Sequence, residues 1–247
     1  MLLNSLKDLA RPIVQKTGVL PPLRALRGHS MRMIRSCRRH FDRSPGQSQP
    51  NVRHRLYKMS ADGLPTWFGY YDKTPFSRDN NTILAMAMTH KKDWSKNAAH
   101  FPVKVGYFDW SRVISGKPMF QQFAETATWS WQQGCMLQWF PDDPDRLVLY
   151  NRLVDGQYGS VIQDVFTKEI LMAYRRPIYA IDPAGRWGVS LNFSRLERLR
   201  PGYGYANLPD QTLGDAYPNN DGIWVINLET GSSELLLSLR AIAKFRP

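Results

Sequence analysis

The sequence predicts an all-β fold, a partial β-propeller of about three four-stranded antiparallel blades, preceded by a basic helical N-terminal leader. Three observations lead to this prediction. From about residue 64 the chain consists of short apolar runs, rich in β-branched and aromatic residues, separated by Gly, Pro, Asp and Asn. One strand–turn–strand unit recurs three times. No long helical period lies between the strands, which argues against a parallel α/β sheet.

The N-terminal segment differs from the rest of the chain in charge. The chain has 247 residues and a formal net charge of +12. Residues 1–60 carry 13 basic and 2 acidic side chains, a net of +11, whereas residues 61–247 carry 20 and 19, a net of +1. We therefore assign residues 1–60 to a partly helical leader with a linker at 44–50 (SPGQSQP), and residues 61–247 to the partial propeller.

Within the leader, residues 1–44 combine leucines at helical spacing with many arginines. A basic amphipathic surface of this kind favours an anionic membrane surface as partner, and a poorly ordered solubilising leader is the alternative. No apolar run reaches the roughly 18 residues of a transmembrane helix, and no uninterrupted apolar segment marks a secretory signal. We expect a cytoplasmic protein, peripheral to the membrane where the leader binds lipid, without specific nucleic acid recognition.

The repeated units are anchored at Phe76, Phe140 and Ile181, which are 64 and 41 residues apart. A spacing of about 40 residues is typical of one four-stranded blade, and a polar insertion at 90–102 accounts for the longer interval. The strand–turn–strand units at 75–86, 139–150 and 180–191 supply the first two strands of each blade. The third and fourth strands are expected at 103–110 and 119–128, at 159–166 and 170–174, and at 222–228 and 233–239.

Three blades alone would leave two sheet edges exposed, and propellers close with about four to eight blades. We therefore expect the propeller to be truncated at the C-terminus of this chain. A small β-sandwich with irregular loops is the alternative fold.

The first cluster of candidate site residues lies at 67–73 (WFGYYDK). Tyr70 and Asp72 are candidate substrate-binding residues, because tyrosines hold sugars by stacking and hydrogen bonding. Tyr71 and Lys73 are candidate catalytic residues, because Tyr and Lys serve as acid or base when their pKa values are shifted. The alternative is that these aromatic side chains pack between blades.

The second cluster lies at 129–134 (WSWQQG), where Trp131, Gln132 and Gln133 are candidate substrate-binding residues. We expect this segment on the entry strand of a blade, with one of the glutamine amides directed at a ligand. The alternative is that both amides satisfy backbone groups of neighbouring blades.

The third cluster follows a strand into a Gly-rich loop. Guanidinium groups bind carboxylates through two parallel hydrogen bonds, so this loop suits an acidic sugar or a phosphate. The alternative is solvated arginines, with tyrosines covering a blade edge. We expect all three clusters to face one cavity. The substrate-binding candidates of the third cluster are Asn192, Arg195, Arg198, Arg200, Tyr203 and Tyr205.

Motifs of the common enzyme classes are missing from the sequence. The five histidines form no HxH or HxxxH pair, and Cys37 and Cys135 form no zinc motif. No Gly-x-Ser-x-Gly, P-loop or dinucleotide-binding glycine pattern occurs. We therefore expect no metal or cofactor bound by this chain itself, and the hydrolase, NTPase and dehydrogenase classes lose their main support.

Four stretches resemble a family of uncharacterised bacterial propeller proteins: FGYYDKTPFS, WSWQQGCMLQWFP, LNFSRLERLRPGYGY and DGIWVINLETG. More distantly, the pattern resembles oligogalacturonate lyases and other TolB-like propellers, which cleave acidic oligosaccharides by β-elimination. That resemblance implies a divalent metal, held by His and Gln of later blades in a full-length protein.

Two functions remain open from the sequence. The first is binding or β-elimination of acidic oligosaccharides, in which Arg195, Arg198 or Arg200 neutralises the substrate carboxylate and Tyr71 or Lys73 takes the proton. The second is a non-catalytic propeller scaffold for protein partners. The sequence leaves open whether the protein is an enzyme.

Overall fold

The computed structural model describes residues 55–89 and 101–245. The chain divides into two units, Met1–Arg55 and Leu56–Pro247, and all described residues but Arg55 belong to the second. The predicted leader helix and most of the insertion at 90–102 lie outside the described residues. In the part of the chain that the structure describes, no helix has the length and hydropathy needed to cross a bilayer.

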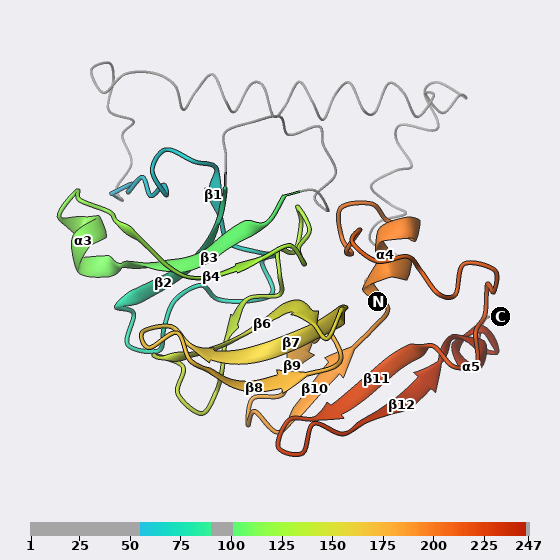
Figure 1. Ribbon diagram of the computed structural model, residues 1–247. Coiled ribbons are helices and arrows are strands. Elements are labelled where there is room, and N and C mark those ends of the chain that lie inside the picture. The colour runs from blue at the N-terminus through green and yellow to red at the C-terminus, as the bar shows by residue number, and fades with distance from the viewer. Residues whose placement is uncertain (1–54, 90–100, 246–247) are drawn as a thin grey trace, which may run out of the picture. The chain divides into compact units, whose positions relative to one another are not determined.

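The second unit contains three four-stranded antiparallel sheets, which follow one another along the chain (Figure 1). In each sheet the strands are adjacent in sequence order. The first sheet comprises β1 (Thr66–Trp67), β2 (Thr82–Met88), β3 (Val103–Asp109) and β4 (Phe120–Thr126); the second comprises β5 (Gln138–Trp139), β6 (Leu147–Val154), β7 (Gln157–Asp164) and β8 (Ile170–Tyr174); the third comprises β9 (Ala180–Ile181), β10 (Trp187–Ser190), β11 (Gly222–Asn227) and β12 (Ser233–Ser238).

The structure confirms the all-β prediction and the three four-stranded antiparallel sheets. The three repeat anchors occupy matching places at the first strand of each sheet. Phe76 forms an isolated bridge with Ile83, Phe140 follows β5 directly, and Ile181 ends β9. The turn after Ile181 explains why Asp marks these units, because the Asp182 carboxylate accepts the backbone N–H groups of Arg186 and Trp187, each at 2.7 Å.

Three short helices accompany the sheets: α3 (Trp110–Ile114), α4 (Phe193–Leu199) and α5 (Leu239–Ala243). The prediction of a continuous loop after β10 is wrong for the α4 residues. Asn192 caps this helix, since its side-chain oxygen accepts the N–H of Arg195 at 2.9 Å. Phe193 and Leu196 pack one face of α4 against an apolar cluster, and this packing stabilises the short helix.

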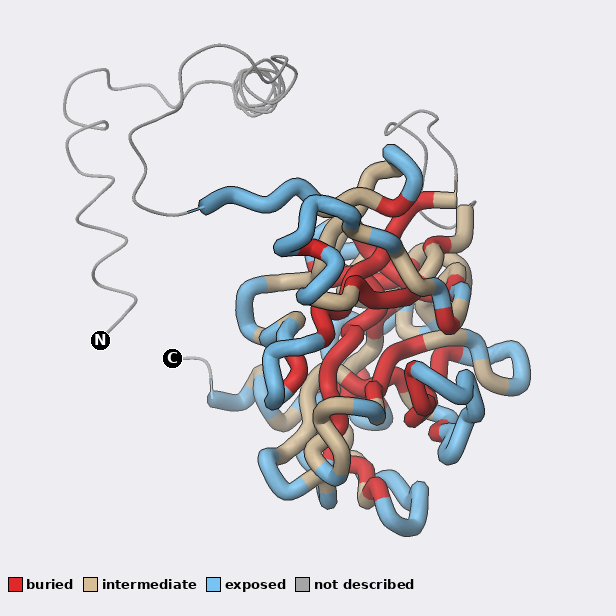
Figure 2. The backbone as a smooth tube through the Cα atoms, turned by 90° about the vertical axis from the view of Figure 1, so that its left-hand side faces the viewer, coloured by how far each residue is buried: buried red, intermediate tan, exposed pale blue. Residues whose placement is uncertain are grey.

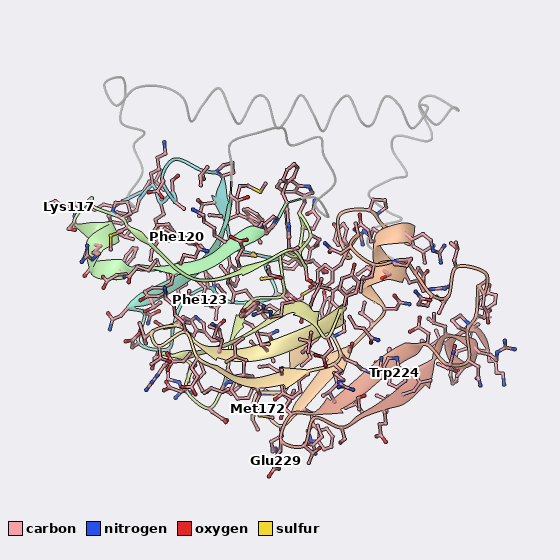
Figure 3. All side chains as sticks on the ribbon, viewed as in Figure 1. Lys117, Phe120, Phe123, Met172, Trp224 and Glu229 are labelled. Atoms are coloured by element: carbon pink, nitrogen blue, oxygen red, sulfur yellow. The ribbon has the colours of Figure 1, made fainter. Side chains whose placement is uncertain are left out.

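The cores lie between successive sheets, and β6 contributes to two of them. Val148 and Tyr150 belong to the core shared with the first sheet, whereas Leu149 belongs to the core shared with the third. Successive strand residues point to opposite faces, so β6 is covered on both sides. Buried backbone accordingly runs through the interior of the unit (Figure 2). On β4, Phe123 joins the core with the second sheet, while Phe120 packs with Phe108 on the opposite face (Figure 3).

Candidate functional site

The first predicted cluster lies on an excursion from the first sheet. Thr66 and Trp67 pair with Ala87 and Met86, and the Pro75 carbonyl oxygen then accepts the N–H of Leu84 at 2.9 Å. Between Trp67 and Pro75 the pairing position on β2 therefore moves by only two residues, from Met86 to Leu84. Residues 68–74 lie outside the sheet, and the chain returns to β2 at Pro75. The excursion passes close to the second cluster, because a Cβ atom on Gly69 would lie only 2.8 Å from the carbonyl oxygen of Gln133.

Residues of the first and third clusters form a continuous row of contacts, tilted and edge to face, which we call the tyrosine ladder. It consists of Tyr71, Tyr70, Tyr203 and Arg200. The ring centroids of Tyr71 and Tyr70 are 4.2 Å apart, and those of Tyr70 and Tyr203 are 6.2 Å apart. The guanidinium carbon of Arg200 lies 3.8 Å from the Tyr203 centroid. Tyr71 is 87% exposed, so the outer end of the ladder is open to a ligand.

Tyr70, in the middle of the ladder, holds its proton tightly. Its hydrogen bonding with Tyr71 raises its pKa to about 12, and burial and the neighbouring Tyr203 act in the same direction. At neutral pH Tyr70 is therefore a neutral phenol, which can donate or accept a hydrogen bond but supplies no negative charge.

The first and second clusters meet at Tyr179, a residue that the sequence analysis did not select. Lys73 Nζ lies 2.9 Å from Asp72 Oδ2 and 4.9 Å from the centroid of the Tyr179 ring. The Tyr179 hydroxyl accepts a hydrogen bond from Gln133 Nε2 at 3.0 Å. Burial raises the pKa of Tyr179, and the nearby Asp72 carboxylate adds to this effect. Gln133 Oε1 is buried without a hydrogen-bond partner in the described structure.

The second cluster forms a turn before β5, so its predicted place on an entry strand is wrong. Ser130 and Gly134 exchange two backbone hydrogen bonds, and Gly134 has a φ of +62°, which ends the extended conformation. The ring of Trp131 lies 4.7 Å from that of Trp129 and packs against the first core. Gln132 is exposed, and its backbone N–H donates to the Gly202 carbonyl at 3.1 Å, which joins the second cluster to the third.

Three residues of the third cluster bind the segment at 210–216 and not the ladder. Arg195 donates to Thr212 Oγ1 and to the carbonyl oxygens of Asp215 and Ala216, at 2.8–3.1 Å. Arg198 pairs with Asp210 at 2.9 Å, and Asn192 Nδ2 donates to Asp210 Oδ1 at 3.2 Å. These contacts position the segment and leave Arg200 as the arginine of this cluster that lies on the ladder.

Tyr205 lies in the core and is not presented to a ligand. Its side chain is fully buried, and its ring stacks on that of Phe193. Its hydroxyl accepts a hydrogen bond from Asn151 Nδ2 at 2.8 Å. Burial raises the pKa of Tyr205 well above its ordinary value. Of the predicted residues, the structure therefore gathers Tyr70, Tyr71 and Tyr203 with Arg200, and Asp72 and Lys73 with Gln133.

A cleft of about 410 Å³ lies between the second and third sheets. Its lining includes Arg175, Arg176 and Trp224, none of which the sequence analysis selected. Asn192 is the one predicted site residue among its lining. The two consecutive arginines before Pro177 were the available sequence signal for this cleft, whereas Trp224 is indistinguishable from an ordinary core residue of a strand.

The described residues do not supply the metal ligands that the lyase resemblance implies. All five histidines lie outside residues 55–89 and 101–245. Within those residues, no group of three or more His, Cys, Asp or Glu side chains is placed to hold a metal ion. No reaction step is therefore derived through a metal.

Comparison with known proteins gives little beyond this geometry. No protein-family model matches the sequence, and neither does any curated protein. Among solved structures, the chain is similar to an oligogalacturonate lyase from Vibrio parahaemolyticus, with 12% sequence identity and a TM-score of 0.41. The likeness covers 71% of this chain and 41% of the lyase chain, so the matched part spans less than half of that protein.

Proposed function

We propose that the protein binds acidic oligosaccharides on the tyrosine ladder. The observation that carries the proposal is the unbroken contact from Tyr71 through Tyr70 and Tyr203 to Arg200. Aromatic rings stack on the apolar faces of sugar rings, and their hydroxyls hydrogen-bond to the sugar. A guanidinium group binds a carboxylate through two parallel hydrogen bonds. A ladder of rings that ends in an arginine therefore suits a chain of sugars that carries carboxylates.

The contacts of the candidate catalytic residues support binding more than cleavage. β-Elimination needs a base that removes the proton next to the carboxylate. Lys73 is engaged by Asp72 and lies over the Tyr179 ring, and both are contacts of a charged ammonium group. Tyr71, the other candidate, is exposed and packs its ring against that of Tyr70, with centroids 4.2 Å apart. We therefore assign Lys73 and Asp72 to the support of the site, and Tyr71 to the stacking surface.

We further propose that the three sheets are consecutive blades of a β-propeller. Three features support this architecture. Each sheet is a four-stranded meander, each begins with a short first strand, and each packs face to face on the next. The contacts of Tyr179, just before β9, join it to Gln133, before β5, and to Lys73, after β1, as residues around a shared channel would.

Titration calorimetry of the full chain with trigalacturonate tests the binding proposal. The expected result is binding of trigalacturonate and at least roughly tenfold weaker binding of neutral maltotriose, since a charged hydrogen-bonded pair contributes about 1.5–3 kcal/mol. Tyr71→Ala and Arg200→Gln should each weaken trigalacturonate binding by roughly fivefold or more. Matched controls are Tyr217→Ala, which removes a half-exposed tyrosine outside the ladder, and Arg186→Gln, which removes an exposed arginine outside it.

Equal effects of the ladder variants and their controls would contradict the ladder as the binding surface. Equal affinity for trigalacturonate and maltotriose would contradict the role of the carboxylates. A release of unsaturated products, detected by their ultraviolet absorbance and lost in Lys73→Met, would contradict the assignment of Lys73 to a supporting role.

One observation favours the scaffold function as a second candidate. Val189 pairs with Val225, and Trp187 and Ile223 lie two residues before them, so these four side chains share one face of the third sheet. Trp187, Val189 and Ile223 are each 39–45% exposed. The opposite face is covered by the second sheet, so this face is suited to a protein partner with an apolar surface, such as a further sheet. Sedimentation of the full chain against Trp187→Ser and Ile223→Ser would show whether the face mediates association.

A further inference from the structure

The cleft between the second and third sheets contains an arginine with four of its five N–H donors unused. The Arg176 guanidinium carbon lies 3.3 Å from the centroid of the Trp224 ring, and Arg176 Nε donates to Ser233 Oγ at 3.0 Å. Neither η nitrogen has a hydrogen-bond or ion-pair partner in the described structure. A guanidinium that is stacked on one face and bound at Nε presents its η nitrogens in a fixed plane, which matches a carboxylate.

Trp224 lies on β11 (Figure 3), and the alternation of side chains along that strand places it in the lining of the cleft. Ile226 lies two residues further on the same face and belongs to the core between the second and third sheets. The apolar core thus ends before Trp224, and Arg176 covers the indole ring in place of another apolar side chain.

The backbone that carries Arg176 is fixed by buried polar side chains. The Arg176 carbonyl oxygen accepts a hydrogen bond from Ser160 Oγ at 2.9 Å. The N–H of Ile178 donates to Asn151 Oδ1 at 2.9 Å and to Ser160 Oγ at 2.8 Å. Asn151 and Ser160 are both fully buried, on β6 and β7. The floor of the cleft is therefore held by the second sheet, and Arg176 needs little ordering to bind a ligand.

The charges of the cleft favour a single carboxylate over a phosphate. Arg175 is paired with Asp155 at 3.2 Å, which leaves Arg176 as the cation of the lining without an ion pair, although the Asp221 carboxylate acts on its charge. Asp221 also lines the cleft, and its carboxylate accepts hydrogen bonds from Asn192 Nδ2 and the Gly222 N–H, each at 2.9 Å. Asp221 would repel a dianion more strongly than a singly charged carboxylate, and its remaining lone pairs can accept ligand hydroxyl groups.

The remaining lining is suited to a small polar molecule. Gln157 and Gln211 are exposed, line the cleft, and have side-chain amides without hydrogen bonds in the described structure. Leu208 and Pro209 add an apolar wall. The volume of about 410 Å³ falls within the range of about 300–1,000 Å³ that is usual for small-molecule sites.

We propose that this cleft binds a small hydroxylated carboxylic acid, whose carboxylate pairs with the η nitrogens of Arg176 and whose hydroxyl groups bond to Asp221 and the glutamine amides. None of the four ladder residues lines the cleft. The proposal therefore concerns a second site and stands whether or not the ladder binds oligosaccharides.

Titration calorimetry of the full chain with D-glucuronate as probe tests this site. Glucuronate should bind, glucose should bind at least roughly tenfold more weakly, and glucose 6-phosphate should also bind more weakly. Arg176→Met should reduce glucuronate affinity roughly tenfold or more, and Arg176→Lys, which keeps the charge but removes the fork, should also reduce it. Arg186→Met is the matched control, since it removes an exposed arginine that does not line the cleft, and its effect should be less than about threefold.

A second measurement on the wild-type chain does not depend on how the variants fold. Glucuronate should protect Arg176 from an arginine-specific dicarbonyl reagent, followed by fragment mass spectrometry that distinguishes it from Arg175, and glucose should not. Absent glucuronate binding, unchanged affinity in Arg176→Met, or tighter binding of glucose 6-phosphate would each overturn the proposal. Loss of glucuronate binding in Tyr71→Ala with none in Arg176→Met would place the ligand on the ladder and likewise overturn it.

Discussion

The ring of Tyr205 lies nearly parallel to the ring of Phe193, with centroids 4.3 Å apart and an interplanar angle of 6°. Phe193 begins α4, and Tyr205 follows the segment that carries Arg200 and Tyr203. The Tyr205 hydroxyl also accepts a hydrogen bond from Asn151 on β6. The segment that supplies half of the ladder is therefore anchored at its end in the core of the unit, through one stack and one hydrogen bond.

Replacing Tyr205 by Phe should lower the free energy of unfolding by about 1–3 kcal/mol, because the buried Asn151 amide loses one of its two acceptors. Urea denaturation of the full chain, followed by tryptophan fluorescence, measures this change. Tyr217→Phe removes the hydroxyl of a half-exposed tyrosine and should change stability by less than about 0.5 kcal/mol. Equal stability of Tyr205→Phe and the wild type would show that the bond contributes nothing.

Gly204→Ala should displace the ladder segment from α4. A Cβ atom at this position would clash with the carbonyl oxygen of Phe193 and the backbone nitrogen of Glu197, and neither backbone atom can move alone. We expect a loss of about 2 kcal/mol or more in unfolding free energy, together with weaker trigalacturonate binding. Gly214→Ala is the control, since a Cβ atom there meets nothing within 4 Å. Trigalacturonate binding unaffected by Gly204→Ala would argue against the ladder.

The high pKa of Tyr70 provides a direct test of the ladder geometry. Hydrogen bonding with Tyr71 is the main cause of the rise to about 12, so Tyr71→Phe should return the pKa of Tyr70 toward 10.0. Spectrophotometric titration of the phenolate, with Tyr70→Phe as the difference reference, measures that pKa in both backgrounds. A Tyr70 pKa that does not fall in Tyr71→Phe would mean that the two hydroxyl groups are not hydrogen-bonded in solution.

Stability in acid should depend on Asp210. Burial alone would raise the pKa of Asp210, but hydrogen bonds from Thr212 and Arg198 outweigh it and lower the pKa below 3.8. The folded state thus binds this proton less tightly than the unfolded state. The resulting stability is present above the unfolded pKa and is lost as the pH falls through the folded pKa. Thermal unfolding between about pH 5 and pH 2 should therefore show a shallower fall for Asp210→Asn than for the wild type. Equal slopes would exclude this role for Asp210.

The basic leader lies outside the described residues, and its binding to an anionic membrane surface remains a prediction from the sequence. Ten of the 13 basic residues of 1–60 fall within 1–44, beside periodic leucines. The full chain should bind vesicles that contain phosphatidylserine, and binding should fall as salt rises because screening weakens the attraction. Deletion of 1–44 should abolish binding, which sedimentation with vesicles measures. Vesicle binding that survives the deletion, or that ignores salt, would contradict the prediction.

Much of the strand content could be predicted from the sequence, because each sheet repeats the same local chemistry. Apolar β-branched runs alternate with turns in which Asp, Asn and Gly fulfil specific backbone roles, as Asp182 does before β10. α4 could not be predicted in this way. A seven-residue helix has almost no periodicity, and its stability comes from the packing of Phe193 and Leu196.

The candidate sites were predictable only as lists of residues. The sequence selected Tyr70, Tyr71, Arg200 and Tyr203, but Tyr203 lies 132 residues after Tyr71, and their contact depends on the excursion at 68–74. Arg195 and Arg198 have the same residue type as Arg200, and only the fold directs them to the segment at 210–216. Tyr179 and Trp224 were missed because single aromatic residues in strand-like segments usually indicate core packing.

The double hydrogen bond from the Ile178 N–H to Asn151 and Ser160 links the floor of the cleft to the second sheet. That amide proton exchanges when the segment that carries Arg176 and Ile178 leaves the buried Asn151 and Ser160 side chains, so its exchange reports local opening of the cleft floor. A ligand that binds Arg176 only while this segment is in place shifts the opening equilibrium toward the closed state. Occupancy of the cleft would therefore slow deuterium uptake at Ile178, a residue that does not line it.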